Sequence, residues 1–411
     1  MKEYMNLLKK RDFLLLWLGQ GVSNIGSSIH SLSVIWFIAE LTGSAKSVSL
    51  FFMILSIPTI VIGPLAGVWV EKWPKKTVIV VTDLIRGALA IAMAFTQSVT
   101  AIYGLSFLSA VAGLFFSPAI RTAIPRIVPK DDLVTANALS SLTGQTARLL
   151  GPVLGGLLTG FYGVKMAVIV NGVSFILSAV SECFINVPAG SQERVRRQAG
   201  SFRRDFVEGW QYIRNNPTVK FVIAFFALSG LPLGAVVVLK VMLLKQALGF
   251  TAEQYGLIMT IEGSGLLLGT FFMGKWGRRW PEIAAMVLGV AGIGAGYLAL
   301  AFSSPFWLAA VWVFSIGFLA TIINIAYGTY LQKAVADEVR SRVFSFDMAI
   351  GEVFGLLSMG AAGILGDAWG VTGVVAGCGA LSVIICLFAT RLPVYRHAKA
   401  TLSATAASVA D

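Results

Sequence analysis

The sequence predicts an all-α membrane protein with twelve transmembrane helices in two pseudo-symmetric six-helix bundles. Its composition favours this fold class, because 56% of the 411 residues are hydrophobic and only 13% are charged. About a dozen apolar stretches are each long enough to cross the ~30 Å hydrocarbon layer of a bilayer as a helix. These stretches are continuously apolar, whereas the strands of a membrane β-barrel alternate between apolar and polar residues.

The apolar stretches define successive spans along the chain. In order, they cover residues 13–39, 48–70, 78–95, 102–120, 133–161, 164–184, 219–239, 255–273, 283–302, 306–327, 344–365 and 371–388. Most lysines and arginines fall in every second connection, and by the positive-inside rule these connections and both termini are cytoplasmic. The opposite connections hold little beyond Lys46, Lys165, Lys240 and Lys245. The net charge of +12 therefore reflects membrane sidedness rather than binding of nucleic acid.

Metal and nucleotide chemistry are both disfavoured. The three cysteines lie in apolar stretches without a C-x-x-C pair, and the chain has only two histidines, so we expect no metal site and no cofactor. The stretch GTFFMGKWGRR, residues 269–279, is one residue short of a phosphate-binding loop. It continues a predicted membrane helix, however, and tryptophan follows its lysine. An ion gradient, carried by protons, is then the expected source of energy.

One long polar segment separates the chain into two halves. We expect an N-terminal six-helix bundle at 1–187, a cytoplasmic linker with an amphipathic helix at 188–217, a C-terminal six-helix bundle at 218–395 and a disordered cytoplasmic tail at 396–411. Aromatic and basic residues recur at helical spacing in the linker. This pattern is typical of a helix that lies on the inner leaflet.

The two halves resemble one another, which is a further reason for the predicted fold class. EKWPKK at residues 71–76 follows the second span, and GKWGRR at residues 274–279 follows the eighth. At a shift of 207 residues, Gly163 coincides with Gly370. Two related six-helix bundles are typical of secondary transporters, whose substrate site lies between the repeats near the bilayer midplane.

Several runs resemble a known family. GPLAGVWVEKWPKK, residues 63–76, resembles the loop 2/3 signature of the major facilitator superfamily, and ARLLGPVLGG, residues 147–156, resembles the helix 5 signature of its drug:proton antiporters. GQGVSNIGSS, SPAIRTAIPRIVPKDDLVTANAL, DFVEGWQYIRNNP and RSRVFSF are similar to the branch that includes macrolide-efflux proteins. The resemblance covers nearly the whole chain. It implies the major facilitator fold and proton-coupled export of a hydrophobic or amphipathic compound, such as a macrolide-like drug, by alternating access.

The resemblance also implies a cytoplasmic gate around the loop after the second span. Its expected members are Gly67, Glu71, Lys72, Lys75, Lys76, Asp83 and Arg86. Asp83 and Arg86 are three residues apart on one helix and can form an ion pair. Glu71 and the loop lysines would hold the second helix against the N-terminus of the eleventh when the cytoplasmic side is closed. The alternative is that these charges are merely solvated.

The fifth helix is expected to place Arg148 near mid-membrane, about 17 Å beyond its cytoplasmic end. A charge there costs about 2.5 to 3.5 kcal/mol, so Arg148 should face the substrate cavity with Gln145, or clamp helix carbonyls. Proline at position 152 removes the usual partner of the Arg148 carbonyl and predicts a bend. Close helix packing and hinges are expected at Gly151, Pro152, Gly155, Gly156, Gly265 and Gly269.

Proton coupling is assigned to carboxyl groups in the second half. Glu262 lies near the middle of the eighth span, and the resemblance implies that the fifth and eighth helices meet. We expect Glu262 to form a switchable pair with Arg148, because a carboxyl group balanced between burial and a guanidinium can load and release a proton. The alternative is that Glu262 is simply hydrogen-bonded in the core. Glu352 is the second candidate.

Polar side chains also follow one side of the first span. Gln20, Asn24, Ser27 and His30 are expected to line the substrate cavity, or alternatively to form hydrogen bonds between helices. The expected partners are protons, membrane lipids and a small amphipathic molecule, and the chain is expected to act as a monomer in the cell membrane. Two further functions stay open: export of lysophospholipids or siderophores by the same fold, and a membrane receptor or scaffold without transport.

Overall fold

The computed structural model describes residues 2–188, 202–277, 280–393 and 395. The chain divides into two compact units. The first consists of Met1–Glu193 and Phe250–Thr260, and the second of Arg194–Gly249 and Ile261–Asp411. The predicted tail at 396–411 and residues 189–201 of the predicted linker lie outside the described residues.

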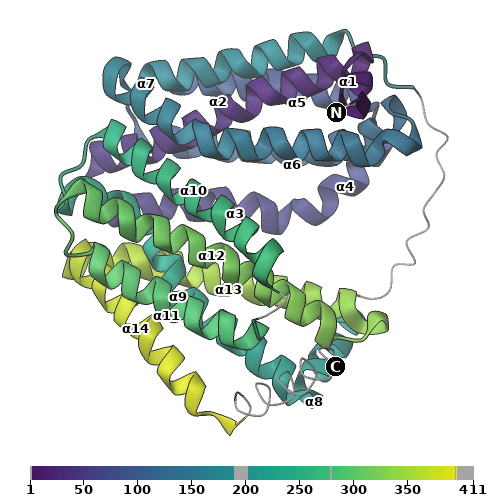
Figure 1. The fold of residues 1–411 in the computed structure, drawn as a ribbon. Helices are drawn as coiled ribbons and strands as arrows, with labels where there is room; N and C mark the ends of the chain where they lie inside the picture. Colours follow the sequence, from purple (N-terminus) through teal and green to yellow (C-terminus); the bar gives the residue numbers. More distant parts are fainter. Residues whose placement is uncertain (1, 189–201, 278–279, 394, 396–411) are drawn as a thin grey trace. The chain divides into compact units, whose positions relative to one another are not determined.

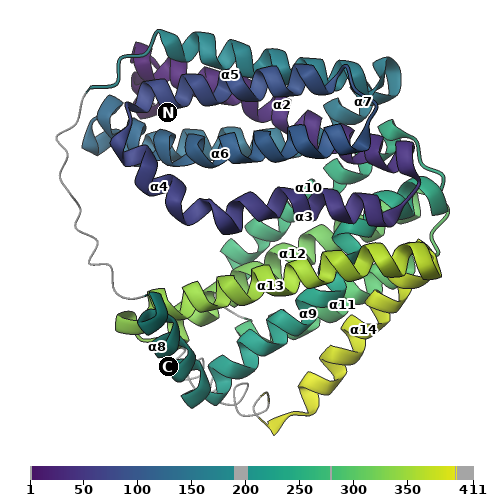
Figure 2. The same ribbon diagram turned by 180° about the vertical axis from the view of Figure 1, so that it is seen from behind.

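The first unit is a bundle of helices around α7. Its elements are α1 (Lys2–Leu8), α2 (Arg11–Thr42), α3 (Ala45–Val61), α4 (Gly63–Lys72), α5 (Lys75–Met93), α6 (Val99–Ile127), the short 3₁₀ turn η1 (Lys130–Asp132) and α7 (Leu133–Cys183). Figure 1 shows α7 beside α2, and Figure 2 shows α5 beside α6. Helix α5 also packs against α7, so α2, α5 and α7 enclose the interior of this unit. Buried apolar side chains of α1, α2, α4, α5, α6 and α7 contribute to its core cluster.

The second unit is a bundle in which α11 lies against both α12 and α14. Its elements are α8 (Phe202–Asn215), α9 (Pro217–Met242), the π-helical turn η2 (Leu243–Ala247), α10 (Ala252–Trp276), α11 (Glu282–Leu300), α12 (Phe306–Ala334), α13 (Asp337–Trp369) and α14 (Val371–Arg391). The first residues of α10 belong to the first unit. Helix α9 packs on α13 and α14, which Figure 2 shows beside it.

The described helices supply the twelve predicted membrane segments in order. Nine of the described helices, α7 among them, are long and apolar enough to cross a bilayer. Helix α7, with 51 residues, contains two predicted spans, separated at Gly163 where φ is 79° and ψ is 164°. Helices α3 and α4 together form one more segment, interrupted at Ile62. The remaining segment is α5, which is less apolar because it carries Lys75, Lys76, Asp83 and Arg86.

Two pairs of turns agree with the internal repeat. Gly163 separates the halves of α7, and Gly370 separates α13 from α14; both have φ near +80°, a region that glycine enters without steric cost. Pro74 precedes α5 with φ −60° and ψ 120°, and Pro281 precedes α11 with φ −61° and ψ 124°. The members of each pair are 207 residues apart. The same backbone turns therefore recur at equivalent places in the two halves.

The predicted linker helix forms as α8, and it docks on a neighbouring helix of its own unit. Glu208 Oε2 lies 2.5 Å from Nη1 of Arg342 on α13. The ring of Trp210 lies 5.4 Å from that of Phe346, also on α13. The aromatic and charged residues of α8, whose spacing predicted a helix on the inner leaflet, thus also contact another helix of the protein.

Candidate functional site

An ion pair joins two membrane-spanning helices of the second unit. Lys240 Nζ on α9 donates a hydrogen bond to Glu262 Oε2 on α10 at 2.6 Å. The two side chains are 10% and 20% exposed. Tyr297 of α11 is buried within electrostatic reach of both charges. The pair therefore places one positive and one negative charge between two membrane-spanning helices.

A second polar group in this unit lies on α12 and α13. The hydroxyl of Tyr327 donates a hydrogen bond to Oδ1 of Asp347, and the ring of Tyr327 stacks on Phe226 of α9 with centroids 3.9 Å apart. A cavity of about 260 Å³ lies beside them, lined by Phe226, Asp347 and Glu352 among others. Glu352 is exposed on α13. The cavity thus combines two carboxyl groups with an aromatic face.

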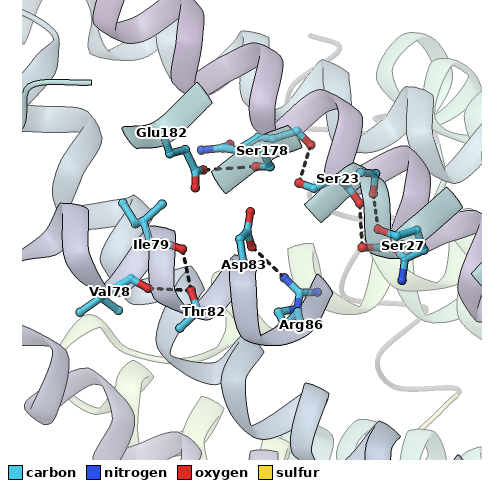
Figure 3. A network of polar contacts seen from close by, with 12 residues as sticks. Ser23, Ser27, Val78, Ile79, Thr82, Asp83, Arg86, Ser178 and Glu182 are labelled. Carbon is cyan, nitrogen blue, oxygen red and sulfur yellow. Dashed lines mark hydrogen bonds and ion pairs between the residues drawn. The ribbon is translucent and has the colours of Figure 1, made fainter. Parts of the chain in front are cut away.

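The interior of the first unit holds another charged cluster, shown in Figure 3. Arg86 Nη1 lies 3.7 Å from Oδ1 of Asp83, three residues earlier on α5. Glu182, on α7, accepts a hydrogen bond of 3.4 Å from the Ser178 hydroxyl. Asp83 and Glu182 are both fully buried. Two carboxyl groups are therefore enclosed between α5 and α7, beside a guanidinium group whose side chain is 21% exposed.

The guanidinium of Arg86 is held by aromatic faces as well as by charge. It lies 4.0 Å from the ring centroid of Phe175 and 5.9 Å from that of Phe116. His30 of α2 is within electrostatic reach of Arg86, and its Nδ1 is buried without a hydrogen-bond partner in the described part of the chain. Buried polar atoms are usually satisfied, so an unpartnered one in a membrane helix suggests function.

The residues predicted to line the substrate cavity differ in exposure. On α2, Gln20 is buried, while Asn24, Ser27 and His30 are half-buried. The hydroxyl of Ser27 donates to the carbonyl of Ser23 in its own helix at 2.7 Å. On α7, Gln145 and Arg148 are both exposed. The predicted pairing of Arg148 with Glu262 would join the two units and stays a prediction, whereas the partner that the structure gives Glu262 is Lys240.

The predicted packing glycines contact several different helices. Gly151 and Gly155 of α7 lie against Ser28 and Ile29 of α2. Gly156 lies against the start of α10 within the first unit, and Gly265 and Gly269 of α10 lie against Phe314 and Phe318 of α12. Helix α7 continues through Pro152, because its one residue with non-helical dihedral angles is Gly163. The predicted bend near Arg148 and the hinge role of these residues stay predictions.

The expected cytoplasmic gate is only partly described. The surroundings of Gly67 and the side chain of Glu71 lie outside the described part of the structure, and Lys72 is exposed. Lys75 is buried, and its ammonium donates to the carbonyls of Val70 and Trp73 at 2.6 and 3.0 Å, which caps the C-terminal end of α4.

The other expected gate residues have different surroundings. Lys76 is half-buried. Asp83 and Arg86 do form the ion pair that their spacing allows, but they lie in the interior network with Glu182.

Comparison with known proteins identifies the family. The sequence profile of the transmembrane secretion effector family matches residues 4–409. The chain belongs to this family. Macrolide efflux protein A of Streptococcus pyogenes is 23% identical over 360 residues, which are 85% of this chain and 87% of that protein. The multidrug efflux pump Tap of Mycolicibacterium fortuitum is 24% identical over 385 residues, 89% of this chain and 92% of the pump.

The solved structures agree with this assignment at the level of the fold. A crystal structure of the nucleoside transporter NupG matches with a TM-score of 0.76 at 15% identity, covering 92% of this chain and 98% of that chain. The transmembrane secretion effector family is a branch of the major facilitator superfamily, so the predicted fold class is confirmed. This chain is a multi-pass membrane transporter and not an enzyme.

Three charged residues of this secretion effector were missed in the sequence. Lys240 was assigned to an outer connection because the predicted seventh span ended at Leu239; that prediction is wrong, since α9 and η2 continue to Ala247. The apolar run Val241–Leu244 beyond the lysine was the available signal. Glu182 stands in an otherwise uncharged stretch, and Asp347 lies between Arg342 and Glu352; nothing local shows what either carboxyl group faces.

Proposed function

We propose that this transporter exports a hydrophobic or amphipathic compound, such as a macrolide-like drug, in exchange for protons. The Lys240–Glu262 pair carries the proposal, because it is a protonatable pair between membrane-spanning helices. Two efflux proteins among the relatives, one for macrolides and one for several drugs, support the direction and the type of cargo. The proton gradient supplies the energy, without a cofactor, and the chain acts as a monomer.

The pair gives the exchange a simple physical basis. While Glu262 is ionised, its attraction to Lys240 holds α9 and α10 together. A proton that reaches Glu262 from the acidic side cancels this attraction and leaves Lys240 without its counter-charge. Substrate binding and protonation then favour different arrangements of the two helices, which is the condition for exchange by alternating access. Arg148, Gln145 and the polar side of α2 are proposed to line the substrate path.

The chain is proposed to lie in the cell membrane with both termini in the cytoplasm. The alternation of lysine- and arginine-rich connections supports this orientation. A cysteine introduced near the N-terminus should react with a membrane-impermeant thiol reagent only after the cells are opened. Labelling in intact cells would contradict the orientation.

Reconstituted vesicles test the exchange directly. With erythromycin as the probe, drug movement should change the pH of the vesicle lumen in the unmodified protein. Glu262→Gln should abolish proton-driven export and leave drug binding measurable, because the amide cannot exchange a proton. Glu282→Gln is the matched control, since Glu282 pairs with Lys333 at 2.6 Å at the start of α11; it should transport normally.

Two results would overturn the proposal. A Glu262→Gln protein that still couples drug export to protons would remove its basis. Drug binding without any pH change in the unmodified protein would favour a receptor over a transporter. Movement of lysophospholipid in place of erythromycin would retain the exchange mechanism and replace the cargo.

A further inference from the structure

The interior of the first unit contains more acid than base. Asp83 and Glu182 are fully buried, and Arg86 is within electrostatic reach of both. Among the described residues, the remaining titratable group near this cluster is His30, which is within electrostatic reach of Arg86. With every carboxyl ionised and His30 neutral, two negative charges would face one positive charge. An enclosed charge without a counter-charge costs several kcal/mol, and such a group takes up a proton instead.

The geometry separates the roles of the two carboxyl groups. Asp83 shares α5 with Arg86 and forms the ion pair at 3.7 Å. Glu182 has the Ser178 hydroxyl on Oε1, and its Oε2 has no hydrogen-bond partner in the described part of the chain. Figure 3 shows the carboxyl groups of Glu182 and Asp83 pointing toward one another. Neither oxygen of Asp83 has a donor in full hydrogen-bond geometry among the described residues, and the Ser178 hydroxyl lies close enough to act on both carboxyl groups.

We propose that Asp83, Arg86 and Glu182 form a second proton-binding site, enclosed in the first unit, in which Glu182 carries the proton. The hydroxyl of the protonated Glu182 faces the Asp83 carboxylate. One proton then cancels the excess negative charge and gives the two carboxyl groups a hydrogen-bond donor between them. Asp83 and Arg86 remain an ion pair. This site shares no residue with the Lys240–Glu262 pair, because its three residues belong to the first unit and the pair to the second.

Occupancy of this site is coupled to helix packing. Release of the proton to water would leave two carboxylates facing one guanidinium, and their repulsion would act between α5 and α7. These helices are in close contact, with Gly87 of α5 against the backbone of Gly172 of α7. Any movement that separates α5 from α7 therefore favours loss of the proton, and an occupied site favours the packed arrangement.

Infrared spectroscopy of the purified protein in lipid vesicles at neutral pH tests the proposal. The carbonyl stretch of a protonated carboxyl group is separate from the bands of carboxylates and amides. The unmodified protein should show this band. In Glu182→Gln the intensity of the band should fall by the amount that one protonated carboxyl group per chain contributes. The matched control Glu282→Gln should retain it, because its carboxylate is paired with Lys333. A band of unchanged intensity in Glu182→Gln would overturn the proposal.

The variant Asp83→Asn is a second test, and its result does not depend on how well Glu182→Gln folds. Without the Asp83 carboxylate, Arg86 needs Glu182 as its counter-charge, so Glu182 should lose its proton and the band should disappear. A band that persists in Asp83→Asn would contradict the proposal that Asp83 and Glu182 share Arg86 as their one counter-charge. Glu262→Gln keeps the two proposals apart: it should retain the band, because Glu262 is ionised beside Lys240. Loss of the band in that variant alone would place the proton on Glu262 and refute the site in the first unit.

Discussion

Each unit of this transporter holds charged side chains between its membrane-spanning helices, but the two sets differ in charge balance and in exposure. In the second unit, Lys240 and Glu262 provide one charge of each sign, with side chains 10% and 20% exposed. In the first unit, two fully buried carboxyl groups share the guanidinium of Arg86. Similar helical frameworks thus enclose a balanced pair in one case and an excess of acid in the other.

The difference suggests two ways in which a membrane protein can hold a carboxyl group. A balanced pair is neutral without a proton, so protonation breaks it and changes its net charge. An enclosed excess of acid becomes neutral only with a proton, so deprotonation is the disruptive event there. Under the two proposals, the partly exposed pair exchanges protons with water directly, whereas the buried carboxyl groups of the first unit exchange theirs only after helix movement. The two units are then expected to respond to pH in opposite directions.

The largest effect should come from breaking the balanced pair. Lys240→Met leaves Glu262 beside a buried apolar chain, and we expect a loss of about 3 kcal/mol in the free energy of unfolding. Adding Glu262→Gln should restore much of this loss, because the uncompensated charge is removed. Thermal unfolding in detergent micelles measures both, and the two single variants complete a double-mutant cycle. Strictly additive effects would show that the pair is not coupled and would weaken the contrast between the units.

An intermediate effect should come from the close packing of α7 against α2 in the first unit. A Cβ on Gly155 of α7 would lie 3.0 Å from the carbonyl oxygen of Ile29 on α2, and this backbone cannot move aside cheaply. Gly155→Leu should therefore lower stability by about 2 kcal/mol. Gly144→Leu is the matched control on the same helix, because nothing lies within 4 Å of its Cβ position. Equal melting temperatures for the two variants would contradict tight α2–α7 packing.

The smallest effect should come from changing the shape of the cation in the first unit. Arg86→Lys keeps the positive charge but removes the flat guanidinium that stacks on Phe175 at 4.0 Å. We expect a loss of about 1 kcal/mol in stability. The exposed swap Lys333→Arg should change stability by less than this. If Arg86→Lys melts like the unmodified protein, charge alone holds the cluster and the aromatic contact is incidental.

Much of the fold was predictable because its signals are local. Hydropathy located the membrane segments, and the turn at Gly163 was foreseen as the boundary between two spans. The glycine repeat also anticipated the matching turn at Gly370. The prediction failed at Lys240, where a single charge appeared to end a span. A lysine paired with a carboxylate on another helix can lie inside the membrane-spanning region, and no window of sequence around Lys240 contains its partner at Glu262.

By itself, the sequence determined the helices, their order and the division into two related halves, because apolar length and glycine turns depend on neighbouring residues. Only the tertiary structure decided which charges meet. Asp83 and Glu182 are 99 residues apart in the chain, and their meeting depends on how α5 and α7 are rotated and packed. The same holds for Lys240 and Glu262: each charge is visible in the sequence, but its counter-charge is chosen by the helix that packs beside it.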